Sequence, residues 1–541
     1  MAAVTVDITG MTCEHCAQTV HRALEKLPGV EARVSYPEGK AYVEKMGSSR
    51  VPEIVGAISA AGYGAREVGR GASRGSGGAG LHVAIIGSGS AAFAAAIRAA
   101  QEGARVTMIE SGVLGGTCVN VGCVPSKILI RAAESARTQE YPRFAGLGAC
   151  SPAIDRAALA DQQQERVDAL RQAKYQDVLD GNPAIRLLKG RARFQDAHTL
   201  IVEGEGASRT VVADRFLIAT GAMPDVPAVS GLTETPYWTS TDALVARSAP
   251  AHLIVLGASV VALELAQAFL RLGSRVTVLA RTGLLSREDQ DVGAALQRVL
   301  VAEGMVVHTQ TAVQRVAFKD GAFFVDTNQG TITGDRLLVA TGRRARTEEL
   351  GLEAVGVRRD DHGRIVVDDS LRTHVPHIYA AGDCTALPQF VYVAANAGTR
   401  AAVNMTGGDE RIDLTVMPAV VFTDPQVATV GLSQTQAERQ GLVVESRTLA
   451  LEHVPRALAN FDTEGFIRLV ALRETGRLVG AQVVAAQAGE VIQSAALAIQ
   501  ARMSTADLAV QLFPYLTMVE GLKLCAQTFT QDVAQLSCCA G

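Results

Sequence analysis

The sequence has few aromatic residues and no long apolar or basic runs, and these absences narrow the possible functions. Aromatic residues make up 4% of the 541 positions, with a single Trp. No apolar run approaches the ~18 residues of a membrane span, and no block of Lys and Arg indicates a nucleic-acid surface. The first residues lack the basic and apolar parts of a signal peptide. We therefore expect a cytoplasmic protein without a nucleic-acid partner and without stable membrane association.

Glycine is abundant, and the cysteines are arranged in an unusual way. The 52 glycines suit α/β nucleotide-binding folds, in which the backbone approaches phosphate closely. Six of the nine cysteines form three close pairs, namely Cys13 with Cys16, Cys118 with Cys123, and Cys538 with Cys539. Cys150, Cys384 and Cys525 stand alone, and we expect them to be structural. Because a reducing compartment disfavours a disulfide framework, the pairs indicate redox chemistry or metal binding.

The length favours three or four domains, and the chain divides by pattern. Residues 1–68 predict a small ferredoxin-like βαββαβ unit, and the Gly- and Ser-rich residues 69–80 predict a flexible linker. The rest predicts an α/β fold with two Rossmann-like nucleotide-binding domains and an α+β cap or dimerisation domain. The first nucleotide-binding domain is expected in two parts, at 81–225 and 346–410, with the second at 226–345 and the last domain at 411–541.

The first nucleotide site is predicted at a glycine turn between a strand and a helix. Gly87 and Gly89 follow an apolar strand, and Ala92 occupies the third position of the motif. The glycines allow backbone N–H groups to approach a pyrophosphate at the start of the helix. Glu110 ends the next strand, where its carboxylate can accept a hydrogen bond from a ribose hydroxyl.

The same plan recurs at a second turn, with one difference that bears on the cofactor. Gly257, Ser259 and Ala262 form a looser version of the motif. Arg281 ends the next strand in place of an acid, and Arg287 follows nearby. An arginine there favours a ribose 2′-phosphate, so we predict NADPH rather than NADH.

A long motif connects the first turn with a known family. Residues 115–127 read GGTCVNVGCVPSK, which resembles the active-site segment of the flavin disulfide reductases. The resemblance extends from residue 81 to the end of the chain and implies FAD at the first site and NADPH at the second. It also implies that Cys123 lies against the flavin and that Cys118 faces the substrate. Two such cysteines can close to a disulfide or open to a dithiol.

The resemblance implies roles for further residues. Lys127 is expected near the flavin, with Glu264 as its partner, and Asp383 in the segment YAAGDC is expected toward the ribitol. The other residues expected to contact the two cofactors are Gly112, Gly116, Thr117, Ala192, Thr220, Gly221, Gly342 and Val391.

The substrate is indicated by a missing histidine. Disulfide reductases of this family carry a His–Glu dyad in a segment of the form His-Pro-Thr-x-x-Glu, in which the histidine protonates the leaving thiolate. Here Tyr515 occupies the histidine position, and no histidine follows His453. The departure argues against an organic disulfide and favours a metal ion, whose reduction does not require that acid.

The C-terminal cysteines support a metal substrate. Cys538 and Cys539 offer two thiolates to a soft cation on a mobile tail. Together with Tyr515, the pattern resembles the mercuric reductases within this family. That resemblance implies a homodimer in which the tail of one subunit reaches the active site of the other. It also matches Tyr515 and Tyr175 to tyrosines that line the mercury path.

The N-terminal unit carries its own cysteine pair. Cys13 and Cys16 lie between a strand and a helix in the segment GMTCEHC, which resembles the heavy-metal-associated domain of metallochaperones. Two thiolates at this spacing can hold a soft ion. Mercury(II) and copper(I) both fit the pair, and a thioredoxin-type redox role is less compatible with the surrounding fold.

These features give one hypothesis and two alternatives. We expect Hg2+, delivered as a complex with small thiols, to be reduced to Hg0 by NADPH through FAD and the pair Cys118/Cys123. A disulfide reductase is the nearest alternative, but it should retain the His–Glu dyad. A metal-sequestering protein would need only Cys13/Cys16, and it leaves the two nucleotide motifs unexplained.

Overall fold

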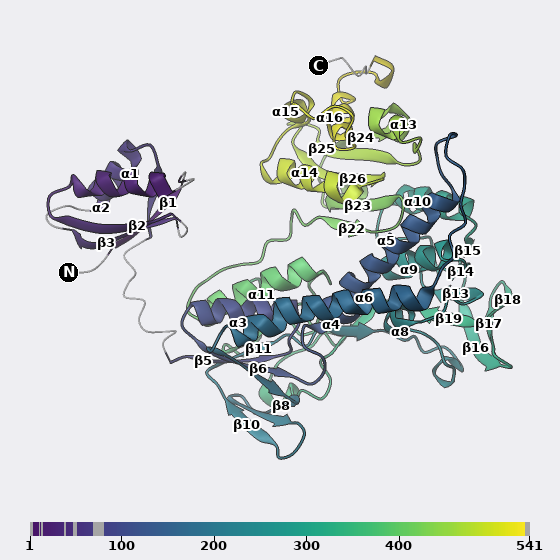
Figure 1. Ribbon diagram of the computed structural model, residues 1–541, viewed down its shortest axis with the longest axis horizontal. Helices are drawn as coiled ribbons and strands as arrows, with labels where there is room; N and C mark the ends of the chain where they lie inside the picture. The colour runs from purple at the N-terminus through teal and green to yellow at the C-terminus, as the bar shows by residue number, and fades with distance from the viewer. Residues whose placement is uncertain are drawn as a thin grey trace. The chain divides into compact units, whose positions relative to one another are not determined.

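The computed structural model describes residues 4–9, 11, 14–36, 39–46, 51–68 and 80–535 of the chain. The chain forms two compact units, Met1–Gly80 and Leu81–Gly541 (Figure 1). Each unit has its own hydrophobic core. Among the described residues, no helix combines the length and the apolar character needed to cross a membrane.

The N-terminal unit is a four-stranded antiparallel sheet covered by two helices. Its elements are β1 (Val4–Thr9), α1 (Glu14–Glu25), β2 (Val30–Ser35), β3 (Lys40–Met46), α2 (Val51–Ala60) and β4 (Gly64–Val68). The strand order is β2-β3-β1-β4. Val20 and Leu24 of α1 and Ile54 and Ile58 of α2 are buried against the sheet. The predicted βαββαβ arrangement is therefore present.

The first sheet of the larger unit is parallel, and the glycine turn lies at the carboxyl ends of its strands. It has the order β21-β11-β5-β6-β7. The strands are β5 (His82–Ile86), β6 (Arg105–Glu110), β7 (Ile185–Lys189), β11 (Arg215–Ile218) and β21 (Ile378–Ala380), with an adjoining antiparallel meander of β8 (Arg191–Asp196), β9 (Thr199–Glu203) and β10 (Arg209–Val212). Helices α3 (Ser90–Gln101) and α11 (Val391–Met405) pack against each other beside it. Because β21 pairs with β11, the chain returns to this sheet after the second nucleotide-binding unit.

The second parallel sheet repeats the plan of the first on a smaller scale. It has the order β15-β14-β13-β19 and carries a second meander, β16-β17-β18. The elements are β13 (His252–Leu256), α9 (Val260–Arg271), β14 (Arg275–Leu279), α10 (Gln290–Ala302), β15 (Val306–His308), β16 (Val313–Lys319), β17 (Ala322–Thr327), β18 (Gly330–Gly334) and β19 (Arg336–Val339). Short strands β12 (Ala222–Pro224) and β20 (Arg343–Ala345) pair with each other where the chain passes between the two sheets.

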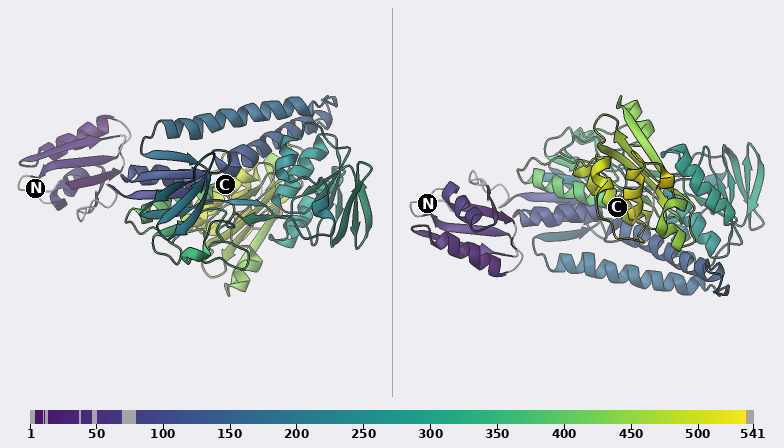
Figure 2. Two further views of the ribbon diagram at one scale, coloured as in Figure 1. Left: turned by 90° about the horizontal axis from the view of Figure 1, so that it is seen from below. Right: turned by 90° about the horizontal axis from the view of Figure 1, so that it is seen from above.

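A group of helices between the two glycine turns carries the cysteine pair. The helices are α4 (Gly116–Val121), α5 (Cys123–Glu140), α6 (Arg156–Arg171), a π-helical turn (Gln172–Gln176), α7 (Asp177–Asp180) and α8 (Ser240–Val245). The long helices α5 and α6 lie side by side (Figure 2). Helix α5 also packs against α9 of the second nucleotide-binding sheet, so the cysteine segment and that sheet are in direct contact.

The C-terminal part is an antiparallel sheet with helices on it. The sheet has the order β22-β23-β26-β25-β24. The elements are β22 (Ala419–Val421), β23 (Gln426–Gly431), α12 (Gln434–Arg439), β24 (Val444–Ala450), α13 (Pro455–Ala459), β25 (Phe466–Leu472), β26 (Leu478–Ala485), α14 (Ala488–Gln500), α15 (Thr505–Ala509) and α16 (Glu520–Gln527).

One predicted element is wrong in length. The sequence predicts a helix over residues 504–512, but α15 ends at Ala509. Val510 and Leu512 are 76% and 96% exposed, so no burial of an apolar face stabilises a further turn. Pro514 follows soon after and also disfavours continuation of the helix.

Both parallel sheets contain the same histidine contact. His82 is the first residue of β5, and its Nε2 lies 2.8 Å from Thr107 Oγ1 on β6. His252 is the first residue of β13, and its Nε2 lies 2.9 Å from Thr277 Oγ1 on β14. Burial lowers the pKa of both histidines. Each imidazole is therefore held in its neutral form in the folded protein.

We expect this pair to make the protein less stable in mild acid. A histidine whose pKa is lower in the folded state binds fewer protons there than in the unfolded chain, so stability is lost as the pH falls below the ordinary histidine value of 6.5. Replacing His82 and His252 together by Asn should flatten the dependence of Tm on pH in that range. His362→Asn, at an exposed position, is the control. An equally steep loss of Tm in the double variant would contradict the assignment.

Candidate active site

At the first glycine turn, neighbouring backbone atoms approach so closely that only glycine fits. Gly87 has a φ of 116°, and a Cβ there would lie 2.3 Å from Ala219 O. Gly116 has a φ of 66°, and its Cβ would lie 2.6 Å from Gly89 Cα. Because Gly89 has no side chain to cap α3, the first N–H groups of that helix are available to an anion. This cradle fits the pyrophosphate of a dinucleotide.

Two carboxylates lie close to this turn. Glu110 Oε2 accepts a hydrogen bond from Ser88 Oγ at 2.6 Å, and its Oε1 accepts one from Gly112 N at 2.6 Å. These contacts hold the acid at the carboxyl end of β6, where a ribose is expected. Asp383 follows Gly382, whose Cβ would lie 3.3 Å from Ala91 Cβ at the start of α3. The donors and acceptors around the turn therefore fit FAD.

The second turn has the same construction. Gly257 has a φ of 121°, and a Cβ there would lie 2.3 Å from Ala340 O, which matches the relation between Gly87 and Ala219. Arg281 and Arg287 are both exposed in the segment that follows β14. Their guanidinium groups are available to a 2′-phosphate at this end of the sheet, so the site fits NADPH.

The remaining predicted cofactor residues occupy varied positions. Thr220 Oγ1 donates to Arg346 O at 2.5 Å, and Gly221 adopts a φ of 70° beside it. Val391 is the first residue of α11, whereas Ala192 lies in β8 and is buried in the core. Gly112, Gly116 and Thr117 line the path from β6 into α4, and Gly342 precedes β20. The contacts of these residues with cofactors stay predictions.

The cysteine pair lies at a break between two helices. Cys118 is in α4, and Cys123 is the first residue of α5. Gly122 separates the helices, and a Cβ there would lie 2.9 Å from Thr117 O. A hydrogen bond from the Cys118 thiol, together with the Lys127 ammonium, lowers the pKa of Cys123 to about 7 against the effect of burial. The same hydrogen bond raises the pKa of Cys118, so the pair holds one proton and one thiolate near neutral pH.

Lys127 is fixed by a carboxylate from the second nucleotide-binding part. Its Nζ donates to Glu264 Oε2 at 2.6 Å, so the predicted pair is present. The Glu264 side chain is 4% exposed, whereas the Lys127 side chain is 34% exposed. Lys127 Nζ also lies 4.6 Å from the centre of the Phe422 ring. The ammonium is therefore held on two sides.

Tyr175 lies in the π-helical turn and belongs to the same site. Its ring packs at 4.7 Å against Phe93, and its side chain bonds with Ser90 at the start of α3. Burial, and then the neighbouring Cys118, raise the pKa of Tyr175. The phenol is therefore held in its neutral form beside Cys118.

Sequence reasoning missed three polar residues around this site. Asn120 Nδ2 donates to Leu114 O at 2.9 Å, and Arg171 Nη1 donates to Asn120 Oδ1 at 2.9 Å, which fastens the Cys118 segment to the end of α6. Arg343 lies near Asp383 and Cys123, and burial lowers its pKa. Asn120 lies between the two cysteines of the motif, and that position was the available clue to it.

The other predicted metal-path residues lie apart or outside the described residues. Tyr515 lies between α15 and α16 and is 55% exposed. The next residue, Leu516, donates its N–H to Glu520 Oε2 at 3.3 Å. Cys16 lies in α1 and is half-buried. Cys13, Cys538 and Cys539 lie outside the described residues.

Comparison with known proteins gives the family of each part. The model for pyridine nucleotide-disulphide oxidoreductases matches residues 81–398, and the model for their dimerisation domain matches residues 417–526. The model for heavy-metal-associated domains matches residues 5–64. A mercuric reductase from Acidithiobacillus ferrooxidans is 58% identical over 99% of this chain and 98% of its own. The chain belongs to the mercuric reductase family.

Further relatives agree with this assignment. A mercuric reductase from Shigella flexneri is 56% identical over 99% of this chain and 100% of its own. Among solved structures, the HOCl-induced flavoprotein disulfide reductase RclA from Escherichia coli is similar, with a TM-score of 0.75 and 29% identity. That likeness covers 83% of this chain and 99% of RclA. Mercuric reductases of this family use FAD and NADPH, the two cofactors that the glycine turns fit.

The lowered pKa of Cys123 can be tested by alkylation. In the reduced protein, the rate at which iodoacetamide modifies Cys123 should rise with a midpoint near pH 7. Lys127→Met removes a cation that favours the thiolate, so the midpoint should move to higher pH. Lys319→Met, at an exposed position on β16, is the matched control and should leave it unchanged. Mass spectrometry of the peptide that contains Cys123 gives the rate, and identical midpoints in all three proteins would contradict the prediction.

Proposed function

We propose that this chain is an NADPH-dependent mercury(II) reductase that converts Hg2+ to Hg0. The observation that carries the proposal is the pair Cys118/Cys123, which combines a thiolate and a thiol beside a dinucleotide turn in a chain of this family. When bound, FAD supplies a two-electron carrier between NADPH and the thiols. The overall reaction balances: NADPH gives two electrons and one proton, Hg2+ takes the two electrons, and the two thiolates that brought the metal leave as thiols with that proton and one from solvent.

The cysteines bind the metal by exchange of thiolate ligands. Soft divalent mercury prefers thiolate sulfur, so Cys123 and then Cys118 replace the two small thiols that bring it. Cys118 loses its proton to the departing small thiolate in this step, and metal binding favours the deprotonated form of the cysteine. The phenol of Tyr175 lies beside Cys118 and encloses the substrate side of the site. Mercury passes between sulfur ligands and is never released as a free ion.

The position of Tyr515 fits a metal substrate. A disulfide substrate leaves a thiolate that a histidine must protonate, and Tyr515 occupies the position of that histidine. A phenol has a much higher ordinary pKa than an imidazole, so it is a poor donor near neutral pH. Reduction of Hg2+ does not need this proton.

Two further cysteine pairs deliver mercury to this site. We propose that Cys538 and Cys539 collect Hg2+ and pass it to Cys118 and Cys123 of the partner subunit in a homodimer. The match to a dimerisation domain over residues 417–526 supports the assembly. In the N-terminal unit, Cys13 and Cys16 capture Hg2+ before this step, and the heavy-metal-associated domain supports this role.

A disulfide reductase is the second candidate. The structural likeness to RclA favours it, since that protein is described as a flavoprotein disulfide reductase. Both candidates share FAD, NADPH and the pair Cys118/Cys123, so only the substrate separates them.

The deciding experiment measures NADPH oxidation by the purified protein in excess small thiol, with HgCl2 added or omitted. We expect oxidation that depends on HgCl2 and mercury vapour above the solution. Cys118→Ser should lower this activity about a hundredfold or more, because it removes one of the two metal ligands. Oxidation driven instead by oxidised glutathione or lipoamide, without mercury vapour, would establish the disulfide reductase.

The role of the C-terminal pair gives a separate prediction. Replacing Cys538 and Cys539 by Ala should slow turnover of the Hg2+–dithiolate complex about tenfold, because a tethered pair raises the local concentration of competing thiolate. Reduction of the bound FAD by NADPH should be unchanged. Cys150→Ala, which removes an exposed thiol elsewhere in the chain, is the matched control. A full rate in the tail variant would exclude delivery by this pair.

A further inference from the structure

Helix α9 presents three polar side chains to one short segment of the C-terminal part. Glu264, Gln267 and Arg271 are spaced by three and four residues, so they lie on one face of the helix. Their side chains are nearly fully buried. The segment that they contact is Phe422–Asp424, which joins β22 to β23. A buried polar face of this kind needs specific partners, because each unpaired group would be costly.

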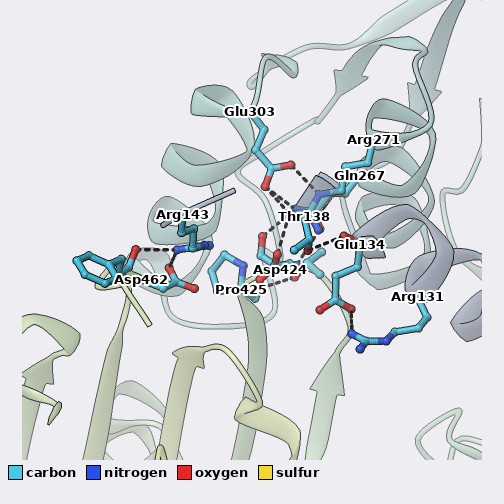
Figure 3. Close-up of polar contacts among 12 residues, drawn as sticks. Arg131, Glu134, Thr138, Arg143, Gln267, Arg271, Glu303, Asp424, Pro425 and Asp462 are labelled. Carbon is cyan, nitrogen blue, oxygen red and sulfur yellow. Dashed lines mark hydrogen bonds and ion pairs between the residues drawn. The ribbon is translucent and has the colours of Figure 1, made fainter. Parts of the chain in front are cut away.

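Gln267 and Arg271 hold the end of this segment. Gln267 Oε1 accepts from Asp424 N at 2.8 Å, and Gln267 Nε2 donates to Asp424 O at 2.7 Å. One amide therefore bonds both main-chain groups of the same residue. Arg271 Nη2 donates to Asp424 Oδ2 at 2.9 Å, and Glu303 accepts from the same guanidinium at 2.5 and 2.9 Å (Figure 3).

Phe422, the first residue of the same segment, contacts the ion pair of Lys127 and Glu264 next to the cysteines. Phe422 N donates to Glu264 Oε1 at 2.8 Å, while Lys127 Nζ donates to Glu264 Oε2 at 2.6 Å. The Phe422 ring lies 4.6 Å from the same Nζ. Two of the contacts that place Lys127 therefore depend on where Phe422 lies. Asp424 is two residues further along, so a shift of the segment at Asp424 moves Phe422 as well.

We propose that Gln267 is a positioning residue for the reduction of FAD by NADPH. It fixes Asp424, which fixes Phe422, and Phe422 with Glu264 holds the ammonium of Lys127 beside Cys123. Helix α9 begins at the turn of the second nucleotide site, so one rigid element joins that turn to this contact. The inference rests on the proposed use of FAD and NADPH and is independent of mercury.

The test follows reduction of bound FAD by NADPH in a stopped-flow instrument, without oxygen and without mercury. Gln267→Met keeps the size of the side chain and removes both bonds to Asp424. We expect reduction to slow about tenfold, because small displacements of catalytic groups cost large factors in rate. The NADPH concentration that gives half the maximal rate should stay the same, since Gln267 is not part of the predicted nucleotide contacts. A full rate in Gln267→Met would overturn the proposal.

The matched control distinguishes the positioning of Lys127 from general stabilisation of the interface with the C-terminal part. Arg143 and Asp462 also join the segment after α5 to the C-terminal part, at 2.7 Å, and neither is among the contacts of Lys127 or Glu264 (Figure 3). Asp462→Asn should therefore lower Tm without slowing FAD reduction. If Asp462→Asn slows reduction as much as Gln267→Met, loosening of the interface explains both, and the proposal fails.

A double-variant cycle tests the route through Glu264. Once Glu264 is replaced by Ala, Gln267→Met should slow reduction less than it does alone, because one of the two contacts through which Phe422 places Lys127 is already lost. Independent, multiplied effects would overturn the proposed route. If Gln267→Met does not fold, Gln267→Glu takes its place in the experiment, since the glutamate keeps the acceptor for Asp424 N and loses the donor to Asp424 O.

Gln267→Glu should slow FAD reduction while the FAD content of the protein stays unchanged, and a wild-type rate would count against the proposal. None of these measurements contains mercury, so a failure of the mercury assay would leave them interpretable.

Discussion

The ion pair of Lys127 and Glu264 joins the helix of the redox cysteines to the second nucleotide-binding part. Lys127 Nζ and Glu264 Oε2 lie 2.6 Å apart, and the carboxylate is almost completely buried. An unpaired buried carboxylate would be strongly destabilising, so α5 and α9 cannot separate without a large cost. The same ammonium favours the thiolate of Cys123. One contact therefore serves both the packing of two helices and the chemistry of the cysteine at the start of α5, and changes at either end should reach the other.

The two nucleotide turns show how one backbone solution serves two cofactors. Gly87 and Gly257 each allow a carbonyl from a following segment, Ala219 O or Ala340 O, to approach within 2.3 Å of where a Cβ would lie. The shared geometry provides the cradle for phosphate. The difference lies at the end of the next strand, where Glu110 is fixed by two hydrogen bonds in the first site and Arg281 is exposed in the second. Charge at that single place distinguishes a ribose hydroxyl from a ribose phosphate.

Much of the fold and part of the site could be predicted because the relevant residues are close in sequence. The glycine turns, the pair Cys118/Cys123 and the βαββαβ pattern are all local. Gln267 and Phe422 could not be found in this way, because an amide in a helix and an aromatic residue after a strand are common. Their bonds, to Asp424 and to Glu264, each span more than 150 positions. The π-helical turn that carries Tyr175 has no pattern of its own in the sequence. Helix α15 was predicted too long because Val510 and Leu512 look apolar enough to extend a helix, whereas both side chains are exposed in the structure.

The choice of substrate follows from the proton that the site lacks. The pair Cys118/Cys123 alone is suited equally to a disulfide and to a soft metal ion, since both react with thiolate. Reduction of a disulfide produces two thiolates that need protons, and a residue near neutral pKa must supply one of them. Tyr515 cannot do so efficiently, whereas Hg2+ needs only ligands and electrons. Tyr175 carries a raised pKa beside Cys118, so it too keeps its proton. A site in which the phenol of Tyr175 is a poor acid, and whose sulfurs share a single proton, suits a substrate that exchanges ligands better than one that must be protonated.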